Sequence, residues 1–158
     1  MEARMANDNN PSDMLTEYVT VMLGEQLFGL PISRVQDVFM LEKLTRVPLS
    51  QPEIAGVLNL RGRIVTAIDM RRRLGLPKRE DGKKPMAIGI ESKGESYGLL
   101  IDSVGEVLKL DENMREPNPV NLDTRLARVS AGVHRLEGQL LVVLDVDRVL
   151  DMGEAIAA

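Results

Sequence analysis

Two aspartates are the first candidates for chemistry in this sequence, because they occupy equivalent places in an internal repeat. Asp69 ends the segment IVTAID and Asp145 ends the segment LLVVLD. Two carboxylates related by a pseudo-twofold axis could share a proton, as in the dyad of aspartic proteases. That dyad also needs a small hydroxyl residue and a glycine after each aspartate, whereas Met70 and Val146 follow here. We therefore expect each aspartate to cap a short helix, with a β-barrel enzyme built on the pair as the rival hypothesis.

Other signatures of catalysis or metal binding are weak. His134 is the single histidine, its repeat equivalent is Leu58, and no cysteine exists to complete a metal site with it. The segment Asp145-Val-Asp147 begins like a calcium loop but lacks the glycine and the distal glutamate. Glycine-rich phosphate loops and nucleophile elbows are missing from the sequence. The residues therefore predict no catalytic group, no cofactor and no metal, and a structural or a surface position for His134.

Charged residues are concentrated in two stretches of the chain. Five arginines stand between residues 61 and 73, and five acidic residues between residues 102 and 116. Two interpretations stay open, namely solvated surfaces or complementary patches that orient protein partners. Arg61 and its repeat equivalent Glu137 carry opposite charges at equivalent hairpin tips, which favours contacts with different partners. We predict that Asp37 lies near Arg61 and pairs with it.

These residues belong to a duplicated unit. Residues 28–38 read FGLPISRVQDV and residues 97–107 read YGLLIDSVGEV, with five of 11 positions identical. Residues 55–74 and 131–150 share eight of 20 positions, and they lie seven residues further apart than the first pair. The second copy therefore contains a seven-residue insertion. A unit of about 65 residues is only marginally stable alone, so we expect the two copies to pack together and share a core.

Each copy reads as short strands separated by turn signals, which predicts an all-β barrel or sandwich. Arg61–Gly62 and Glu137–Gly138 each place glycine second in an expected two-residue hairpin turn. Helices are predicted only at 50–55, 69–74 and 145–150, the last extending to Ala157. The sequence leaves open whether a strand stays in the barrel of its own copy or crosses to the other.

The repeat also divides the chain. Residues 1–16 are polar and without periodicity, and are expected to form a disordered tail. The first copy runs from about residue 17 to 77, the charged segment 78–85 is the linker, and the second copy runs from about 86 to 152. Residues 153–158 are expected to be the end of a C-terminal helix and a tail.

Composition narrows the class of protein further. Hydrophobic residues make up 44% and charged residues 28% of the 158 residues, as in ordinary globular proteins. Cysteine is absent, which excludes disulfides and fits a reducing compartment. No apolar stretch is long enough to insert into a membrane, and no secretory signal is evident. A formal charge of −4 and only four aromatic residues argue against a nucleic-acid partner, which is the third hypothesis.

The string RVQDV followed by RVPLSQPEIAGVLNLRGRIVTAIDMRRRLGLP resembles the core of the family of the chemotaxis coupling protein CheW. That family has a pattern P-x-x-I-x-G-V-x-N-L-R-G before a strand that ends in aspartate. The segment YGLLIDSVGEV resembles the family's pattern G-x-x-V-D-x-V-x-x-V. The resemblance covers about residues 17–152, and Asp37 stands where the family more usually has glutamate.

The resemblance implies an all-β fold of two packed five-stranded SH3-like β-barrels with short helical turns and a C-terminal helix. It implies a cytoplasmic, non-enzymatic adaptor, associated with membrane-bound chemoreceptor arrays, that couples receptor tips to the regulatory domain of the histidine kinase CheA. One barrel face would grip the kinase domain, and an inter-barrel groove would take the receptor helix tip. By position, the residues tied to partner binding are Val35, Asp37, Gly56, Asn59, Arg61 and Val107.

Overall fold

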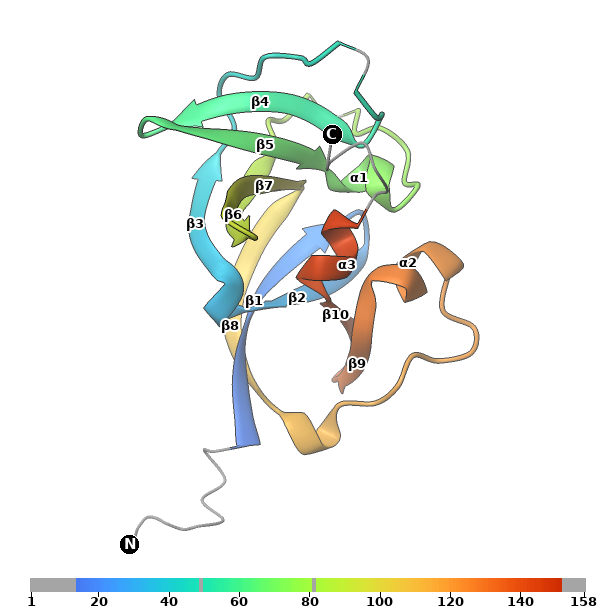
Figure 1. Cartoon of the computed structure of the whole chain (residues 1–158). Helices are drawn as coiled ribbons and strands as arrows, with labels where there is room; N and C mark the ends of the chain where they lie inside the picture. Colours follow the sequence, from blue (N-terminus) through green and yellow to red (C-terminus); the bar gives the residue numbers. More distant parts are fainter. Residues whose placement is uncertain (1–13, 49, 81, 152–158) are drawn as a thin grey trace, which may run out of the picture.

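The computed structural model describes residues 14–48, 50–80 and 82–151, and most of them form strands (Figure 1). The strands are β1 (Leu15–Leu23), β2 (Gln26–Pro31), β3 (Val35–Met40), β4 (Ile54–Leu60), β5 (Arg63–Asp69), β6 (Met86–Ser92), β7 (Glu95–Ile101), β8 (Ser103–Asp111), β9 (Ser130–Leu136) and β10 (Gln139–Leu144). The short α-helices are α1 (Met70–Arg73), α2 (Thr124–Val129) and α3 (Val146–Leu150).

The strands form two five-stranded sheets, each curled into an SH3-like barrel as predicted. The order in one sheet is β8-β1-β2-β10-β9, here called the β1 barrel, and in the other β3-β6-β7-β5-β4, here called the β3 barrel. Each barrel is mostly antiparallel and contains one parallel pair, β2 with β10 and β5 with β7. The equivalent parallel pairs reflect the duplication seen in the sequence.

The two barrels do not correspond to the two sequence copies. β1 and β2 of the first copy pair with β8, β9 and β10 of the second, whereas β3, β4 and β5 join β6 and β7. The bounds predicted for the two copies, residues 17–77 and 86–152, are therefore not the bounds of the two barrels. Each copy contributes strands to both barrels, which answers the question of strand crossing that the sequence left open.

The largest hydrophobic core, here called the shared core, lies between the barrels, as expected for two units that are only marginally stable alone. It gathers buried side chains from both sheets, among them Phe28, Leu30, Ile88 and Leu99, all with no exposed surface. Smaller clusters fill each barrel, one around Tyr18 and Leu141 and one around Ala67 and Ala87. Along a strand, side chains alternate between the shared core and the interior of their own barrel, because successive side chains point to opposite faces of a sheet.

The helices follow the aspartate caps that the sequence predicted. The Asp69 carboxylate accepts a hydrogen bond from the backbone N–H of Arg72, and the Asp145 carboxylate one from the N–H of Arg148, both at 3.2 Å. These contacts account for both carboxylates without catalysis. The predicted helical turn at 50–55 was wrong, because the Ser50 hydroxyl donates to the carbonyl of Val47 and the chain makes turns before β4.

The insertion in the second copy contains a helix that was not predicted from the sequence. α2 lies between β8 and β9, whereas the described part of the segment between β3 and β4 has no helix. Asp123 caps α2 by accepting from the N–H of Arg125 at 2.8 Å. Leu122 and Leu126 pack against the shared core. The extra residues thus cover an end of that core.

The ends of the described chain correct two boundaries. Leu15 and Thr16 belong to β1 and pair with β8, so the disordered tail predicted for residues 1–16 reached too far, and its first 13 residues lie outside the described range. The last helix ends at Leu150 with Asp151 as its C-cap, not at Ala157. Residues 152–158 lie outside the described range, so the predicted helix end and tail are not covered by it. Among the described helices none has the length and apolar character needed to cross a membrane.

Candidate partner-binding site

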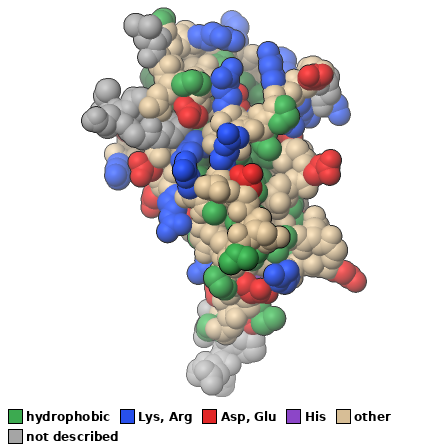
Figure 2. All heavy atoms as spheres, turned by 90° about the vertical axis from the view of Figure 1, so that its right-hand side faces the viewer, with side chains coloured by type: hydrophobic (Ala, Val, Ile, Leu, Met, Phe, Trp, Pro, Cys, Tyr) green, Lys and Arg blue, Asp and Glu red, His purple; other side chains and the backbone are tan. Residues whose placement is uncertain are grey.

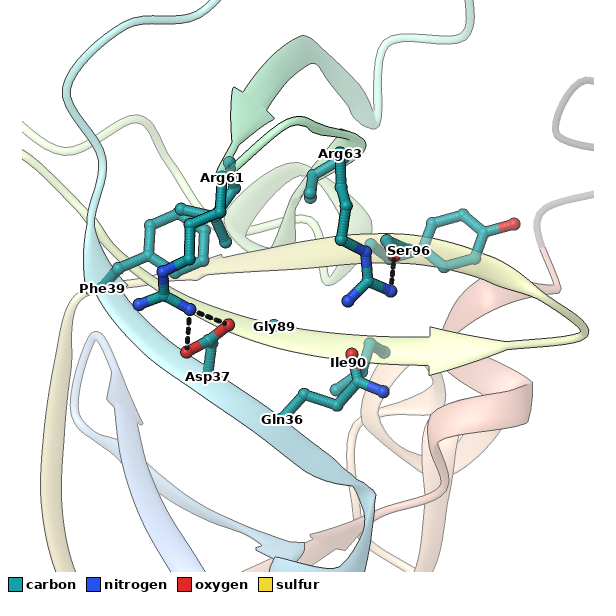
Figure 3. Close-up of a pocket in the computed structure, with 11 residues that line it drawn as sticks. Gln36, Asp37, Phe39, Arg61, Arg63, Gly89, Ile90 and Ser96 are labelled. Carbon is teal, nitrogen blue, oxygen red and sulfur yellow. Dashed lines mark hydrogen bonds and ion pairs between the residues drawn. The ribbon is translucent and has the colours of Figure 1, made fainter.

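Asp37 and Arg61 form the predicted ion pair on the surface of the β3 barrel (Figure 3). One guanidinium nitrogen of Arg61 donates to both carboxylate oxygens of Asp37, at 3.1 and 3.0 Å. The Arg61 side chain is 72% exposed and the Asp37 side chain 31% exposed. The pair therefore joins the tip of the β4–β5 hairpin to β3 while most of the guanidinium remains open to a partner.

Local backbone geometry places both members of the pair. Arg61 and Gly62 have φ values of 52° and 84°, which is the two-residue turn that fits the twist of a hairpin. The side chain of Asn59 accepts a hydrogen bond from the N–H of Gly62 at 2.9 Å and steadies that turn. On β3, the pairing register with β6 shifts between Val35 and Asp37, and such a bulge redirects the side chains next to it.

Gly56 supports this site from within the sheet. Its φ is 151°, and a Cβ atom there would lie 2.4 Å from the backbone carbonyl oxygen of Thr45. The repeat equivalent Gly132 has a φ of 130° and faces the carbonyl of Glu116 in the same way. Gly56 is thus explained by the close approach of the chain to β4, and the structure shows no exposed surface that it offers to a partner.

A hollow opens beside the ion pair at the mouth of the β3 barrel (Figure 3). Its lining includes Phe39 and Ile90, with Arg63 on its rim donating to the Ser96 hydroxyl at 2.8 Å. Gly89 lines it opposite Asp37, and a Cβ atom at Gly89 would lie only 3.1 Å from that of Asp37. Gly89 is not among the residues predicted from the sequence, although a glycine inside a strand is a signal of close approach.

Apolar side chains are exposed on β3 and on β8. Val107 on β8 is 45% exposed and pairs with Val19, a residue of the shared core. On β3, Val38 is 44% and Met40 57% exposed, and Val38 pairs with the shared-core residue Ile88. Paired residues share a face of the sheet, so these side chains lie on the faces that the barrels turn toward each other. Val38 and Met40 were missed, although their spacing in VQDVFM indicates a common face.

The predicted partner-binding residues do not form one cluster. Val35, Asp37, Gly56, Asn59 and Arg61 all belong to the β3 barrel, whereas Val107 belongs to the β1 barrel. Val35 is half-buried and packs against the shared core. Val38 and Met40, further along the same strand, are exposed. The structure therefore offers an ion pair on one barrel and apolar strand residues on both.

The arginine-rich stretch 61–73 is not a single patch. Arg71 binds the Asp102 carboxylate through two hydrogen bonds of 2.9 and 2.6 Å, and Arg73 donates to backbone carbonyls at the end of α3. The hydrogen bonds from Arg71 lower the pKa of the Asp102 carboxyl group, and their effect is larger than that of burial, which acts to raise it. Figure 2 shows the face at the right of Figure 1, where basic side chains are interspersed with acidic ones.

His134 lies in the interior of the β1 barrel, so of the two positions left open by the sequence, structural or surface, the structural one is observed. It is 3% exposed, its ring lies 5.8 Å from that of Tyr18, and its Nε2 has no hydrogen-bond partner. The hydroxyl of Tyr18 donates to Glu112 at 2.7 Å, and Glu112 Oε2 lies 4.0 Å from His134 Nε2. Burial is the main cause that lowers the pKa of His134 and raises that of Tyr18 to about 12. Among the described residues no acidic or histidine cluster is suited to hold a metal ion.

The two barrels expose a charged pair and apolar strand residues, which are features suited to contacts with other proteins. Comparison with known proteins gives the particular family. The model described as CheW-like domain matches residues 17–154. The chain is 28% identical over 142 residues to the chemotaxis protein CheW of Thermotoga maritima, covering 89% of this chain and 92% of the relative. It is 30% identical over 135 residues to the chemotaxis protein CheW of Bacillus subtilis, covering 84% and 85%.

A solved structure agrees with these sequence matches. The crystal structure of the scaffolding protein TtCheW from Thermoanaerobacter tengcongensis superposes with a TM-score of 0.74 at 33% identity, covering 83% of this chain and 89% of that one. The chain belongs to the CheW-like family, and the proteins that it resembles in this family are chemotaxis proteins and a scaffolding protein. The resemblance found in the sequence and the double-barrel fold are both confirmed.

Proposed function

We propose that this protein is a cytoplasmic adaptor that couples the tips of chemoreceptors to the regulatory domain of the histidine kinase CheA within receptor arrays. The observation that carries the proposal is the surface pair of Asp37 and Arg61 on one barrel, because the equivalent positions on the other barrel carry different charges. At the repeat-equivalent positions, Glu106 and Glu137 are both acidic and exposed, so no equivalent ion pair exists there. Two different surfaces on two barrels that share a core suit an adaptor that binds two proteins.

Each surface has a chemistry that suits a separate partner. The hairpin tip with Arg61 can bind a carboxylate on the kinase domain, because arginine is frequent at interface hot spots. The exposed apolar residues Val38, Met40 and Val107 lie beside the shared core and suit the apolar face of a receptor helix. The role requires positioned surfaces and uses no cofactor.

Reconstitution from purified components tests the proposal. The chain is mixed with the regulatory domain of the host CheA and with a receptor signalling fragment, and the mixture is analysed by size-exclusion chromatography. We expect the three proteins to elute together, and the kinase domain and receptor fragment to associate less when the chain is omitted. Failure of the chain to bind either protein at micromolar concentrations would contradict the proposed role.

A further inference from the structure

Within residues 14–151, as far as they are described, the polypeptide passes between the barrels at two places. β2 of the β1 barrel leads into β3 of the other barrel through a single 3₁₀ turn, Ile32–Arg34. β7 of the β3 barrel leads back into β8 through Asp102 alone. These passages are equivalent in the repeat, because Ser33-Arg34 aligns with Asp102-Ser103.

An ion pair connects each passage to a short helix. In one pair the passage supplies the acidic residue, and in the other it supplies the basic residue. At one passage Asp102 accepts from Arg71 of α1. At the other, Arg34 donates to Asp147 of α3 at 3.3 Å. Arg71 and Asp147 are themselves equivalent in the repeat. Both copies therefore connect helix and passage by an ion pair with acid and base exchanged, but the passage residue is shifted by one position, because Asp102 aligns with Ser33 and Arg34 with Ser103.

The two ties differ in strength. Arg71 and Asp102 are joined by two hydrogen bonds, their side chains are 19% and 14% exposed, and Asp102 also accepts from the N–H of Gly24 at 2.8 Å. Arg34 and Asp147 share one contact, with side chains 32% and 68% exposed. Exposed single contacts contribute far less than buried bidentate ones. The ion pair at the passage into β3 is thus the weaker of the two.

The weaker passage leads directly into the candidate site. Val35 follows Arg34, and the bulge before Asp37 interrupts the backbone pairing of β3 with β6 there. Side chains supply additional contacts to this segment, since Gln36 donates to Glu91 at 3.0 Å. The start of β3 therefore depends on the contacts of Arg34 and Gln36 as well as on the sheet.

We propose that Arg34 and Asp147 are positioning residues: their ion pair fixes the start of β3, and with it Val35 and Asp37, relative to α3 and the β1 barrel. Partner binding at this strand would then depend on a residue of the other barrel, at the opposite end of the sequence. The functional part of this inference rests on the proposed function, whereas the structural part concerns the free protein.

A charge-exchange experiment tests the inference. R34D and D147R each place like charges together, and R34D/D147R restores an opposite pair. We expect each single variant to bind the CheA regulatory domain or the receptor fragment about two- to fivefold more weakly, as exposed ion pairs allow, and the exchange to restore affinity. Amide hydrogen exchange of β3 in the free protein should accelerate in the single variants and recover in the double variant.

A matched control is the pair Arg135–Glu116, with a contact of 3.0 Å and side chains 63% and 44% exposed, in the β1 barrel. R135D and E116R should leave binding and the exchange of β3 unchanged. Unchanged exchange of β3 in R34D and D147R, or a double variant that does not recover, would overturn the inference. If the wild-type chain bound neither partner, the proposed function would fail while the exchange measurement still tested the positioning role.

Discussion

Replacing Arg71 by methionine should destabilise the fold at neutral pH. Its two hydrogen bonds to Asp102, of 2.9 and 2.6 Å, connect α1 with the passage from β7 to β8. Removing one partner of a fully buried pair costs roughly 3–5 kcal/mol, because the other charge stays buried. Asp102 is 14% exposed and keeps the N–H of Gly24 as a donor and Arg79, at 3.8 Å, as a second cation, so we expect a smaller loss of about 1–3 kcal/mol for R71M.

The effect should also depend on pH, in a direction that the structure fixes. The pKa of Asp102 is lowered mainly by its hydrogen bonds with Arg71. A lowered carboxylate pKa stabilises the fold above the unfolded value of about 3.9, and this contribution is lost as pH falls through the folded value. The difference in stability between wild type and R71M should therefore be full at pH 7 and shrink in strong acid.

Urea unfolding followed by circular dichroism measures both effects. R72M is the matched control, because Arg72 is the exposed neighbour and caps α1 through its backbone N–H. Substitution of such an exposed side chain should change the unfolding free energy by less than about 0.5 kcal/mol. A loss for R71M no larger than that of R72M, or one that does not change with pH, would refute the reasoning.

Three further predictions concern other sites. G56A should lose about 2–4 kcal/mol of unfolding free energy in a urea titration, because its Cβ atom would lie 2.4 Å from a backbone carbonyl oxygen. G24A is the control, since the space around Gly24 is open, and it should lose only about 1 kcal/mol. Equal losses for the two variants would contradict the role of this close contact. Because the pKa of His134 is lowered in the folded protein, the free energy of unfolding should fall as pH drops below about 6.5. The H134L variant should show a shallower fall between pH 7 and 5. Parallel pH profiles of the two proteins would contradict the lowered pKa of His134. A double-mutant cycle of D37A and R61A should give a coupling energy of about 0.2–1 kcal/mol at low salt, and zero coupling would show that the pair does not persist in solution.

Local features of the fold could be predicted from sequence because their causes lie within a few residues. Asp69 and Asp145 stand directly before the helices they cap, and Arg61–Gly62 carries its own turn preference. The hairpin comparison between the copies also led to the Asp37–Arg61 pair, although these residues are 24 positions apart.

The pairing of strands between copies could not be predicted in this way. Equivalent strands such as β2 and β7 have similar patterns of apolar residues, so local sequence fits either partner equally well. The choice is made by long-range packing, in which β2 lies parallel to β10 and the shared core takes side chains from both copies. The same limit hid the contact between Tyr18 and Glu112, which are 94 residues apart.

The candidate site was predicted in part. The residues selected by family position include a surface pair, Asp37 and Arg61, together with Gly56 and Asn59, whose contacts are internal to the sheet and hairpin. The apolar exposure of Met40 became evident only from the structure, because β3 lies at the edge of its sheet. Edge position depends on the whole topology and leaves no local signal.

The most direct test of the central claim is the affinity of R61E for the CheA regulatory domain and for a receptor signalling fragment, measured by calorimetric titration against wild type. R135E serves as a charge-matched control at an exposed arginine of the β1 barrel. Because a reversed charge at an interface hot spot costs at least about 1.4 kcal/mol, we predict at least a tenfold loss of affinity for one of the two partners with R61E and none with R135E. Unchanged affinity of R61E for both partners would contradict the role assigned to the Arg61 hairpin.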